Sequence, residues 1–409
     1  MDKNQKTKFI QLGLFVLTVI TTTFAGTEWI TGKYLFYGMT WDDFVYGFSF
    51  SIPFLAILTA HEFGHYFTAR YHQVKVTLPY YIPFWLGFLP GPSIGTMGAF
   101  IRIKEHISSR TKYFDVGVSG PIAGFVVAIA VLIYGFRTLP PTEFIYEFHP
   151  EYEVFGENFE ERMEGLDTLI LKSSLNPDRE GYELLPDTII TNDEDRLSIH
   201  FGDNLLMYLG RTYIAPKDRY VPSSKEIMHY PWLLASFLAF FFTALNLLPI
   251  GQLDGGHVLF GLFGSKNHSI ISRILFTIFL FYAGLGAITL KDLNGLMDGT
   301  LDEPFWKLFY LLVTYYASFS VFKETKNRIL YLVSIFTAQL VLNMFTGWEG
   351  YSGWLVFSLL IGRFIGVDHP PVIENQELSI ERKILGWIAL IIFILCFSPE
   401  PLIVEGGGL

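Results

Sequence analysis

The stretch SIPFLAILTAHEFGHYFTAR, residues 51–70, places three ionisable side chains inside an apolar run of helix length. His61 and His65 stand four residues apart, so on an α-helix both rings lie on one face, about one turn apart. That spacing lets both imidazoles bind one zinc ion and leaves Glu62 placed to act as a general base on water. Because ionisable residues are costly within a membrane span, their clustering here indicates a functional site.

The composition of the whole chain is that of an integral membrane protein. Hydrophobic residues make up 51% of the 409 residues and charged residues only 17%, against about 25% charged in typical soluble proteins. The 40 Phe, 22 Tyr and 8 Trp suit lipid-facing surfaces and interfacial belts. A net charge of -10 argues against a nucleic-acid partner, which requires a basic face. The single cysteine, Cys396, leaves no disulfide partner within the chain.

Apolar stretches recur along the sequence at about the length that crosses a bilayer, which is about 20 residues for a helix. We expect an all-α polytopic membrane protein with eight or nine transmembrane helices. The count stays open because 329–366 could form two short spans or one span and a re-entrant segment. The basic start, 1–8, precedes an apolar run that we interpret as a first transmembrane helix rather than a signal peptide. The candidate spans are 9–25, 44–70, 115–136, 231–250, 270–290, 304–322, 329–346, 350–366 and 384–398.

The charges of the connecting segments alternate along the chain. Acidic residues precede the second and sixth spans, whereas basic residues follow the second, fourth and sixth spans and begin the chain. Because Lys and Arg are enriched in cytoplasmic loops, the N-terminus and the basic loops are expected in the cytoplasm. The basic set is Lys3, Lys6, Lys8, Lys75, Arg102, Lys104, Arg110, Lys112, Lys266, Arg273, Lys323, Lys326 and Arg328.

Two segments differ from the spans. The acidic segment 137–230 is the one long polar stretch, and the alternation places it outside the cytoplasm, with Thr188–Thr191 and Leu197–Phe201 as possible short strands. The segment 76–104 is apolar but rich in proline and glycine, so it is no straight span. We interpret it as a membrane-associated strand and loop region, with Gly98–Lys104 as a possible strand; an ordinary interfacial loop is the alternative.

A catalytic zinc usually has three protein ligands and a water. The sequence NLLPIGQLDGGH, residues 246–257, supplies Asp254 after the broken end of an apolar helix. Taken alone, Asp254 could equally be an aspartate at a helix end near the membrane interface. By the alternation of charge, the second and fourth spans both run towards the cytoplasm, so Asp254 reaches the same depth as His61 and His65. Asn246 could bind substrate backbone or a developing oxyanion, or could hydrogen-bond a neighbouring helix.

These motifs resemble the site-2 protease family of intramembrane zinc metalloproteases, peptidase family M50. The resemblance rests on 61–65, on 246–249 with 253–255, and on VSGPIAG at 118–124, and it covers about 44–262. It implies one zinc ion bound by His61, His65 and Asp254, with Glu62 activating water. It also implies a three-helix core that water reaches from the cytoplasmic side. The chain shows no peptide-binding module of the PDZ type, which family members often carry.

The expected organisation follows these motifs. A first helix and loop occupy 1–43, and the first part of the protease core occupies 44–136. The acidic segment 137–230 separates it from the third core helix at 231–262, and further helices fill 263–409. His257 could share the metal environment or lie at the membrane interface, and the second alternative is favoured. The other histidines outside the motifs are assigned ordinary structural or surface roles; they are His72, His106, His149, His200, His229, His268 and His369.

The expected activity is that of a metalloendopeptidase that hydrolyses transmembrane or membrane-adjacent segments of membrane proteins in regulated intramembrane proteolysis. Its partners are the lipid bilayer and membrane-protein substrates, in a bacterial inner membrane. Two alternatives are open: a membrane metal transporter or carrier, which also places His, Glu and Asp in spans, and a catalytically silent homologue that binds membrane proteins. A carrier leaves Glu62 between two ligands unexplained, and the intact glutamate argues against a silent homologue.

Overall fold

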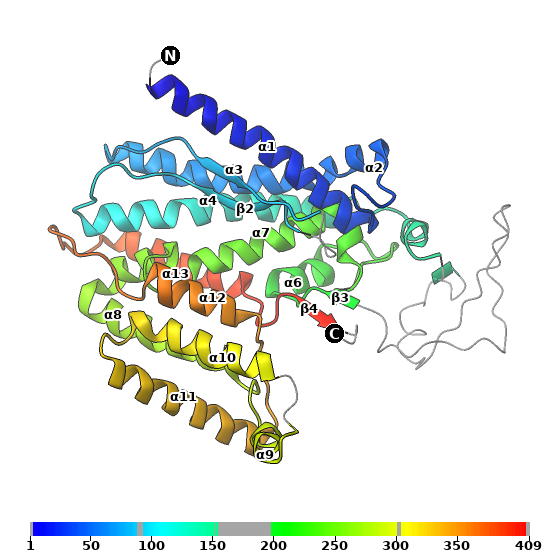
Figure 1. Cartoon of the computed structure of the whole chain (residues 1–409). Coiled ribbons are helices and arrows are strands. Elements are labelled where there is room, and N and C mark those ends of the chain that lie inside the picture. Colours follow the sequence, from blue (N-terminus) through cyan, green and yellow to red (C-terminus); the bar gives the residue numbers. More distant parts are fainter. Residues whose placement is uncertain (1–2, 88–92, 151, 154–197, 301–303, 406–409) are drawn as a thin grey trace.

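The computed structural model describes residues 3–87, 93–150, 152–153, 198–300 and 304–405. Within these ranges the chain is mostly helical and has few, short strands (Figure 1). Among the described residues, four helices are long and apolar enough to cross a membrane, and 231–247 and 354–365 are shorter apolar helices. The chain is therefore an integral, multi-pass membrane protein. The four long helices are Gln5–Thr31, Trp41–Tyr71, Arg110–Arg137 and Thr325–Thr346.

Every one of the nine predicted spans overlaps a helix of the structure. The stretch 329–366 forms two helices separated by a non-helical segment, while the number of membrane crossings stays a prediction. The helices are α1 (Lys3–Thr31), α2 (Trp41–Tyr46), α3 (Phe48–Tyr71), α4 (Arg110–Arg137), α6 (Leu205–Tyr213), α7 (Pro231–Leu247), α8 (Asp254–Gly284), α9 (Leu290–Asp298), α10 (Pro304–Ala317), α11 (Thr325–Thr346), α12 (Trp354–Leu360) and α13 (Ile380–Cys396). Short 3-10 turns η1 (Thr142–Glu147), η4 (Ile227–His229) and η5 (Ser318–Ser320) and the π-helical turn η6 (Ile361–Ile365) complete them.

The helices α3, α4, α7 and the start of α8 pack against one another. α7 is the most buried of them, with Leu234, Phe237 and Phe240 inside the largest apolar cluster. α3 and α4 approach closely because Gly64 faces the backbone of α4, where the Ser119 hydroxyl donates to the Gly64 carbonyl oxygen at 3.1 Å. Small residues allow such close approach between membrane helices.

The segment after α3 contains a strand, as expected, but this strand is only partly the predicted Gly98–Lys104, and it pairs with a second strand, which was not predicted, in a two-stranded antiparallel sheet. β1 (Tyr80–Pro83) pairs with β2 (Thr96–Phe100), with Tyr80 opposite Phe100. Past Phe100 the pairing continues only as separate contacts, such as Thr77 N–H to the Arg102 carbonyl oxygen at 3.0 Å. The prediction missed the start of the strand because Gly95, which has φ 82°, forms the turn that begins it.

A second small sheet joins distant parts of the chain. β3 (Ser198–His200), within the predicted strand Leu197–Phe201, pairs antiparallel with β4 (Ile403–Glu405) near the C-terminus. The other predicted strand, Thr188–Thr191, lies outside the described residues. The pairing places the C-terminal strand beside the acidic segment, at the end of the helical bundle opposite the N-terminus (Figure 1).

Substituting Gly64 with alanine should loosen the contact between α3 and α4. A Cβ at Gly64 would lie 2.6 Å from the Ser119 carbonyl oxygen, whereas at Gly13 of α1 nothing lies within 4 Å. Overpacking of this kind costs about 1–3 kcal/mol. Gly64→Ala is expected to lower the apparent melting temperature in detergent, whereas Gly13→Ala leaves it unchanged or raises it. Equal melting of the two variants would contradict the tight contact.

Candidate metal centre

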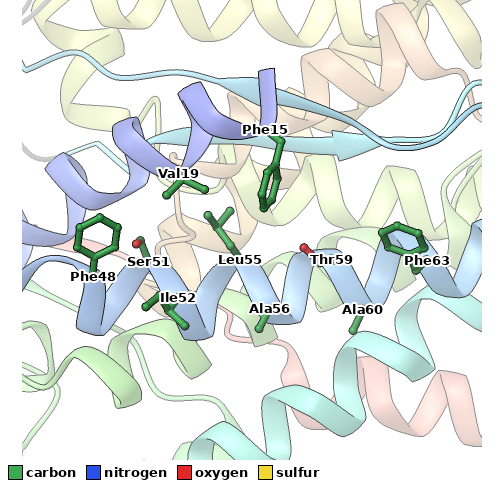
Figure 2. A pocket seen from close by; sticks show the side chains of 10 residues that line it. All are labelled: Phe15, Val19, Phe48, Ser51, Ile52, Leu55, Ala56, Thr59, Ala60 and Phe63. Atoms are coloured by element: carbon green, nitrogen blue, oxygen red, sulfur yellow. The ribbon is translucent and has the colours of Figure 1, made fainter. Parts of the chain in front are cut away.

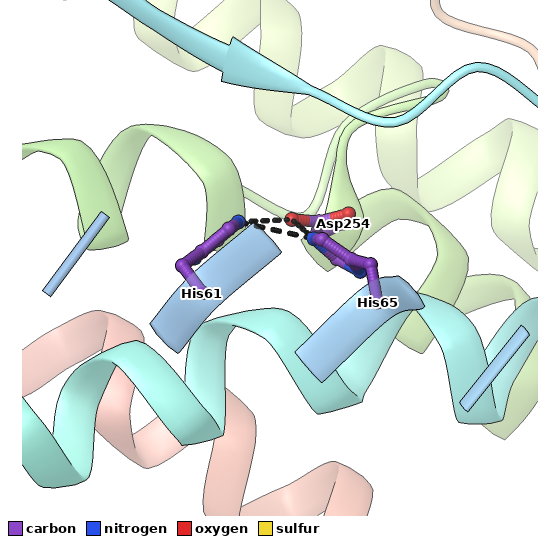
Figure 3. A group of neighbouring side chains, drawn as sticks. All are labelled: His61, His65 and Asp254. Carbon is purple, nitrogen blue, oxygen red and sulfur yellow. Dashed lines mark hydrogen bonds and ion pairs between the residues drawn. The ribbon is translucent and has the colours of Figure 1, made fainter. Parts of the chain in front are cut away.

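His61 and His65, from adjacent turns of α3, meet Asp254 at the first turn of α8 (Figure 3). The two Nε2 atoms are 3.0 Å apart. Asp254 Oδ2 lies 3.5 Å from His61 Nε2 and 3.2 Å from His65 Nε2. Both histidines are buried, and Asp254 is largely so. The structure therefore brings together the three side chains that the sequence predicts as ligands of one zinc ion.

The spacing of these three atoms fits one tetrahedral ion. Zinc bonds of about 2.0–2.2 Å place neighbouring ligand atoms about 3.3–3.6 Å apart. The three observed distances agree with that range to within about 0.3 Å. Two imidazole nitrogens and one carboxylate oxygen also form a donor set suited to zinc.

A backbone group of α4 orients one of the rings. His65 Nδ1 lies 2.7 Å from the Val116 carbonyl oxygen, to which it donates, and this leaves Nε2 as the nitrogen that faces Asp254. Such contacts fix the tautomer and orientation of a metal-binding histidine. Gly120 permits the approach, because a Cβ there would overlap the His65 ring. Sequence reasoning missed Val116, since a backbone carbonyl leaves no mark in the side-chain pattern.

Asp254 belongs to the helix after the one in which the sequence predicted it. It begins α8 rather than ending the fourth span, and a compact loop, 248–253, joins α7 to it. Gly251 adopts φ 60° and donates its N–H to Ser272 Oγ at 2.9 Å. Gly255 packs so closely on the end of α7 that a Cβ would overlap the Leu247 carbonyl. The glycines after Pro249 thus allow the tight turn that aims the carboxylate at α3.

Glu62 is buried beside this cluster without belonging to it. Its side chain interacts electrostatically with His65 and Asp254, and it is within interaction range of the backbone amide of Ile101. Ile101 directly follows β2, so the end of the small sheet lies over the glutamate. Nearby, the Tyr81 hydroxyl of β1 and Thr59 Oγ1 of α3 are 2.8 Å apart.

Two further predicted residues lie outside the three-ligand cluster. Asn246 is half-buried on the last turn of α7, and its role in substrate binding stays a prediction. His257 Nδ1 instead contacts His369 Nε2 at 2.9 Å, and the His369 ring stacks on Phe260. Burial lowers the pKa of His369 to about 3, so this ring is neutral at physiological pH. Sequence reasoning missed His369 because it lies 112 positions from its partner.

An apolar groove runs along α3 (Figure 2). It has a volume of about 640 Å³ and lies between α1 and α3. Ala60 and Phe63, which flank His61 and Glu62 in sequence, line the end of the groove nearest the cluster. Its lining residues are Phe15, Val19, Phe48, Ser51, Ile52, Leu55, Ala56, Thr59, Ala60 and Phe63.

Comparison with known proteins finds zinc metalloproteases of plant chloroplasts. A rice (Oryza sativa subsp. indica) protein described as "Probable zinc metalloprotease EGY2, chloroplastic" is 28% identical over 57% of this chain and 32% of its own length. A japonica rice protein described as EGY1 is 24% identical over 63% of this chain and 33% of its own. The Arabidopsis thaliana EGY2 protein is 24% identical over 52% and 28%. The chain thus spans about a third of the length of these relatives.

No solved structure matches the chain significantly. The model of one protein family, described as Peptidase family M50, matches residues 49–290, more than half of the chain. The matched region contains α3 from its second residue onward and the whole of α4, α7 and α8, and so includes all three side chains of the candidate metal-ligand cluster. The chain therefore belongs to peptidase family M50.

Proposed function

We propose that the chain is a zinc-dependent intramembrane endopeptidase that cuts transmembrane or membrane-adjacent segments of membrane proteins, in regulated intramembrane proteolysis. The observation that carries this proposal is the convergence of His61, His65 and Asp254 next to Glu62. Family membership and the relatives described as zinc metalloproteases support it. In this proposal α3, α4 and α7 with the start of α8 form the catalytic core, and one zinc ion is bound there.

The residues of the cluster and Glu62 have different proposed roles in peptide hydrolysis. His61, His65 and Asp254 would hold zinc, which supplies the Lewis acidity that polarises a scissile carbonyl and acidifies water. Glu62 is not among the three ligands, so its carboxylate can accept the proton of the attacking water and deliver it to the leaving amine. The Val116 carbonyl oxygen holds the His65 ring in the required orientation. Asn246 is proposed to bind the substrate backbone.

The substrate must reach this centre in extended form, because helical hydrogen bonds shield a peptide bond in a transmembrane segment. The apolar groove between α1 and α3 offers a surface for such a segment that extends to Ala60 and Phe63, the sequence neighbours of His61 and Glu62. β2 ends directly beside that glutamate, and an unwound segment could add to the sheet through backbone hydrogen bonds. The groove would accept the side chains and the strand would hold the backbone.

The orientation follows the distribution of charge. We propose that the N-terminus and the metal centre lie towards the cytoplasm of a bacterial cell, with the acidic segment outside the inner membrane. Nine crossings would place the two chain ends on opposite sides of the membrane. The pairing of β3 with β4 supports that number, because it places the C-terminal strand beside the acidic segment, on the side opposite the N-terminus. This proposal keeps the predicted division of the chain into five parts, at 1–43, 44–136, 137–230, 231–262 and 263–409.

Two other functions are less well supported. A metal carrier needs ligands that release their ion along a path, whereas the three ligands here are fixed by α3, by the α4 backbone and by a glycine-packed loop. A catalytically silent homologue has no need of a buried carboxyl group at position 62. Substitution of Glu62 distinguishes a protease from a metal carrier and from a catalytically silent homologue.

Glu62→Gln is expected to abolish cleavage and leave zinc binding intact. General acid–base catalysis contributes about 100- to 10,000-fold, so cleavage should fall by at least that factor. Uncut substrates should accumulate in membrane proteomes of cells that carry the variant, and metal analysis should show an unchanged zinc content. Glu105→Gln, an exposed glutamate in a loop, is the matched control and should behave as wild type. Wild-type cleavage by Glu62→Gln would refute the proposed chemistry.

His65→Gln should remove a ligand and weaken zinc binding at this centre by more than 100-fold, since loss of an outer-shell contact alone costs about 10- to 100-fold. The matched control is His72→Gln on the same helix end, where His72 contacts Asp115 at 2.8 Å and lies outside the cluster. Zinc titration of the purified protein should show the loss of one equivalent only in His65→Gln. Equal zinc affinity of both variants would contradict the ligand assignment.

Ile101→Pro should impair cleavage by at least tenfold without loss of zinc. Proline removes the backbone N–H that lies near Glu62 and that continues the edge of β2, whereas Ile101→Val keeps it. Cleavage of a reporter membrane protein in liposomes, together with zinc content, tests this expectation. The role of the strand is disproved if the proline variant cleaves as fast as the valine variant.

A further inference from the structure

A second cluster of metal-binding side chains lies at the opposite end of α7 from the first. His229 precedes α7 by two residues, and Asp254 follows it by seven. The 17 residues of α7 span roughly 25 Å at 1.5 Å per residue. His229 is joined there by Glu226 and by His149, which follows η1. We call these three residues the His149 cluster.

The three ligand atoms of the His149 cluster are spaced like those of the first centre. His149 Nε2 lies 3.2 Å from His229 Nε2 and 3.4 Å from Glu226 Oε2. The distance between His229 Nε2 and Glu226 Oε2 is 3.8 Å. A tetrahedral zinc site requires about 3.3–3.6 Å between neighbouring ligand atoms, so one ion fits here with movements of about 0.2 Å.

Outer contacts orient two of the three ligands. His229 Nδ1 lies 2.6 Å from the Ile30 carbonyl oxygen of α1, to which it donates, and this leaves Nε2 towards the other ligands. Tyr152 donates its hydroxyl to Glu226 Oε1 at 2.6 Å, while Oε2 faces the histidines. The His65–Val116 contact has the same form, a ring nitrogen fixed by a carbonyl of another helix. Such second contacts accompany histidine and carboxylate ligands of metals.

The surroundings of the cluster favour a bound ion over a solvated polar patch. The side chains of Glu226 and His229 are 7% and 9% exposed, and that of His149 is 30% exposed. Phe148 stacks on the His229 ring and Tyr152 stacks on the His149 ring. Water is thus largely excluded from two ligands, which strengthens electrostatic attraction to a cation. The exposed edge of His149 leaves a route by which an ion enters.

We infer that His149, Glu226 and His229 form a second divalent-metal site, suited to zinc, that fastens the outer ends of the core helices. The two imidazoles and one carboxylate match the donor preferences of zinc, and a water would complete four-coordination. The ion would connect the segment after α4, the turn before α7 and, through Ile30, the end of α1. The site lies beyond the proposed catalytic centre and is independent of it. It raises the expected zinc content from one to two per chain.

The zinc content of the full-length protein in detergent tests the inference. After loading with excess zinc and removal of unbound ion, the wild type should hold two equivalents. Glu226→Gln and His149→Gln should each hold one, and His65→Gln combined with Glu226→Gln should hold almost none. Glu147→Gln, an exposed carboxylate just before the cluster, is the matched control and should keep two. Because the His149 side chain is partly exposed, His149→Gln is expected to disturb folding less than Glu226→Gln. A loss of zinc from both variants is therefore not explained by misfolding.

Cobalt supplies a readout that does not depend on the first centre or on activity. In the His65→Gln background, Co²⁺ should give the visible absorption of a tetrahedral site, and addition of Glu226→Gln should remove it. Tyr152→Phe should weaken Co²⁺ binding about 10- to 100-fold with the site retained. A zinc content that is the same in wild type, Glu226→Gln and His149→Gln would overturn the inference. So would a lack of tetrahedral absorption in His65→Gln, and the cluster would then be only a hydrogen-bonded histidine pair.

Discussion

Within an apolar helical bundle, an imidazole or carboxylate group is stable only where other polar groups or a metal ion compensate for the loss of water. α3 carries His61, Glu62 and His65 at such a position, and the neighbouring elements are arranged around that constraint. The Val116 carbonyl oxygen accepts from His65, and Asp254 faces both imidazoles. Gly120 supplies the room that brings the backbone of α4 near enough.

The same constraint accounts for the rigidity of the parts that carry the ligands. α7 is buried along nearly its whole length, and Gly255 in the first turn of α8 packs on its last carbonyl, so Asp254 is held on a short, fixed connection. On the cytoplasmic side in the proposed orientation, Asp115 of α4 accepts two hydrogen bonds from Arg382 and a third from His72. Because the packed connection after α7 holds Asp254 and the Val116 carbonyl oxygen holds His65, the candidate centre is preorganised by helices and short connections.

The two candidate metal-ligand clusters have a similar arrangement at the two ends of α7. Each has two histidines and one carboxylate, and in each a histidine ring is fixed by a main-chain carbonyl of a different helix, Val116 or Ile30. The surroundings differ, and that difference matters for function. The first cluster adjoins Glu62, the end of β2 and an apolar groove, whereas the second adjoins aromatic rings and the ends of helices. The first arrangement suits chemistry on a peptide, and the second suits mechanical support.

The sequence by itself determined the membrane class, the helical stretches and the pairing of His61 and His65 with Asp254. The first two follow from hydropathy, and helical periodicity places His61 and His65 on one face. The pairing with Asp254 follows from the alternating charge of the loops and from the resemblance to a family motif. Only the tertiary structure decided that Asp254 begins α8 and that the strand is Thr96–Phe100. It alone also decided that His149 meets Glu226 and His229 across nearly 80 residues. Those features depend on backbone carbonyls, glycine turns and packing between distant segments, which carry no periodic signal in one sequence.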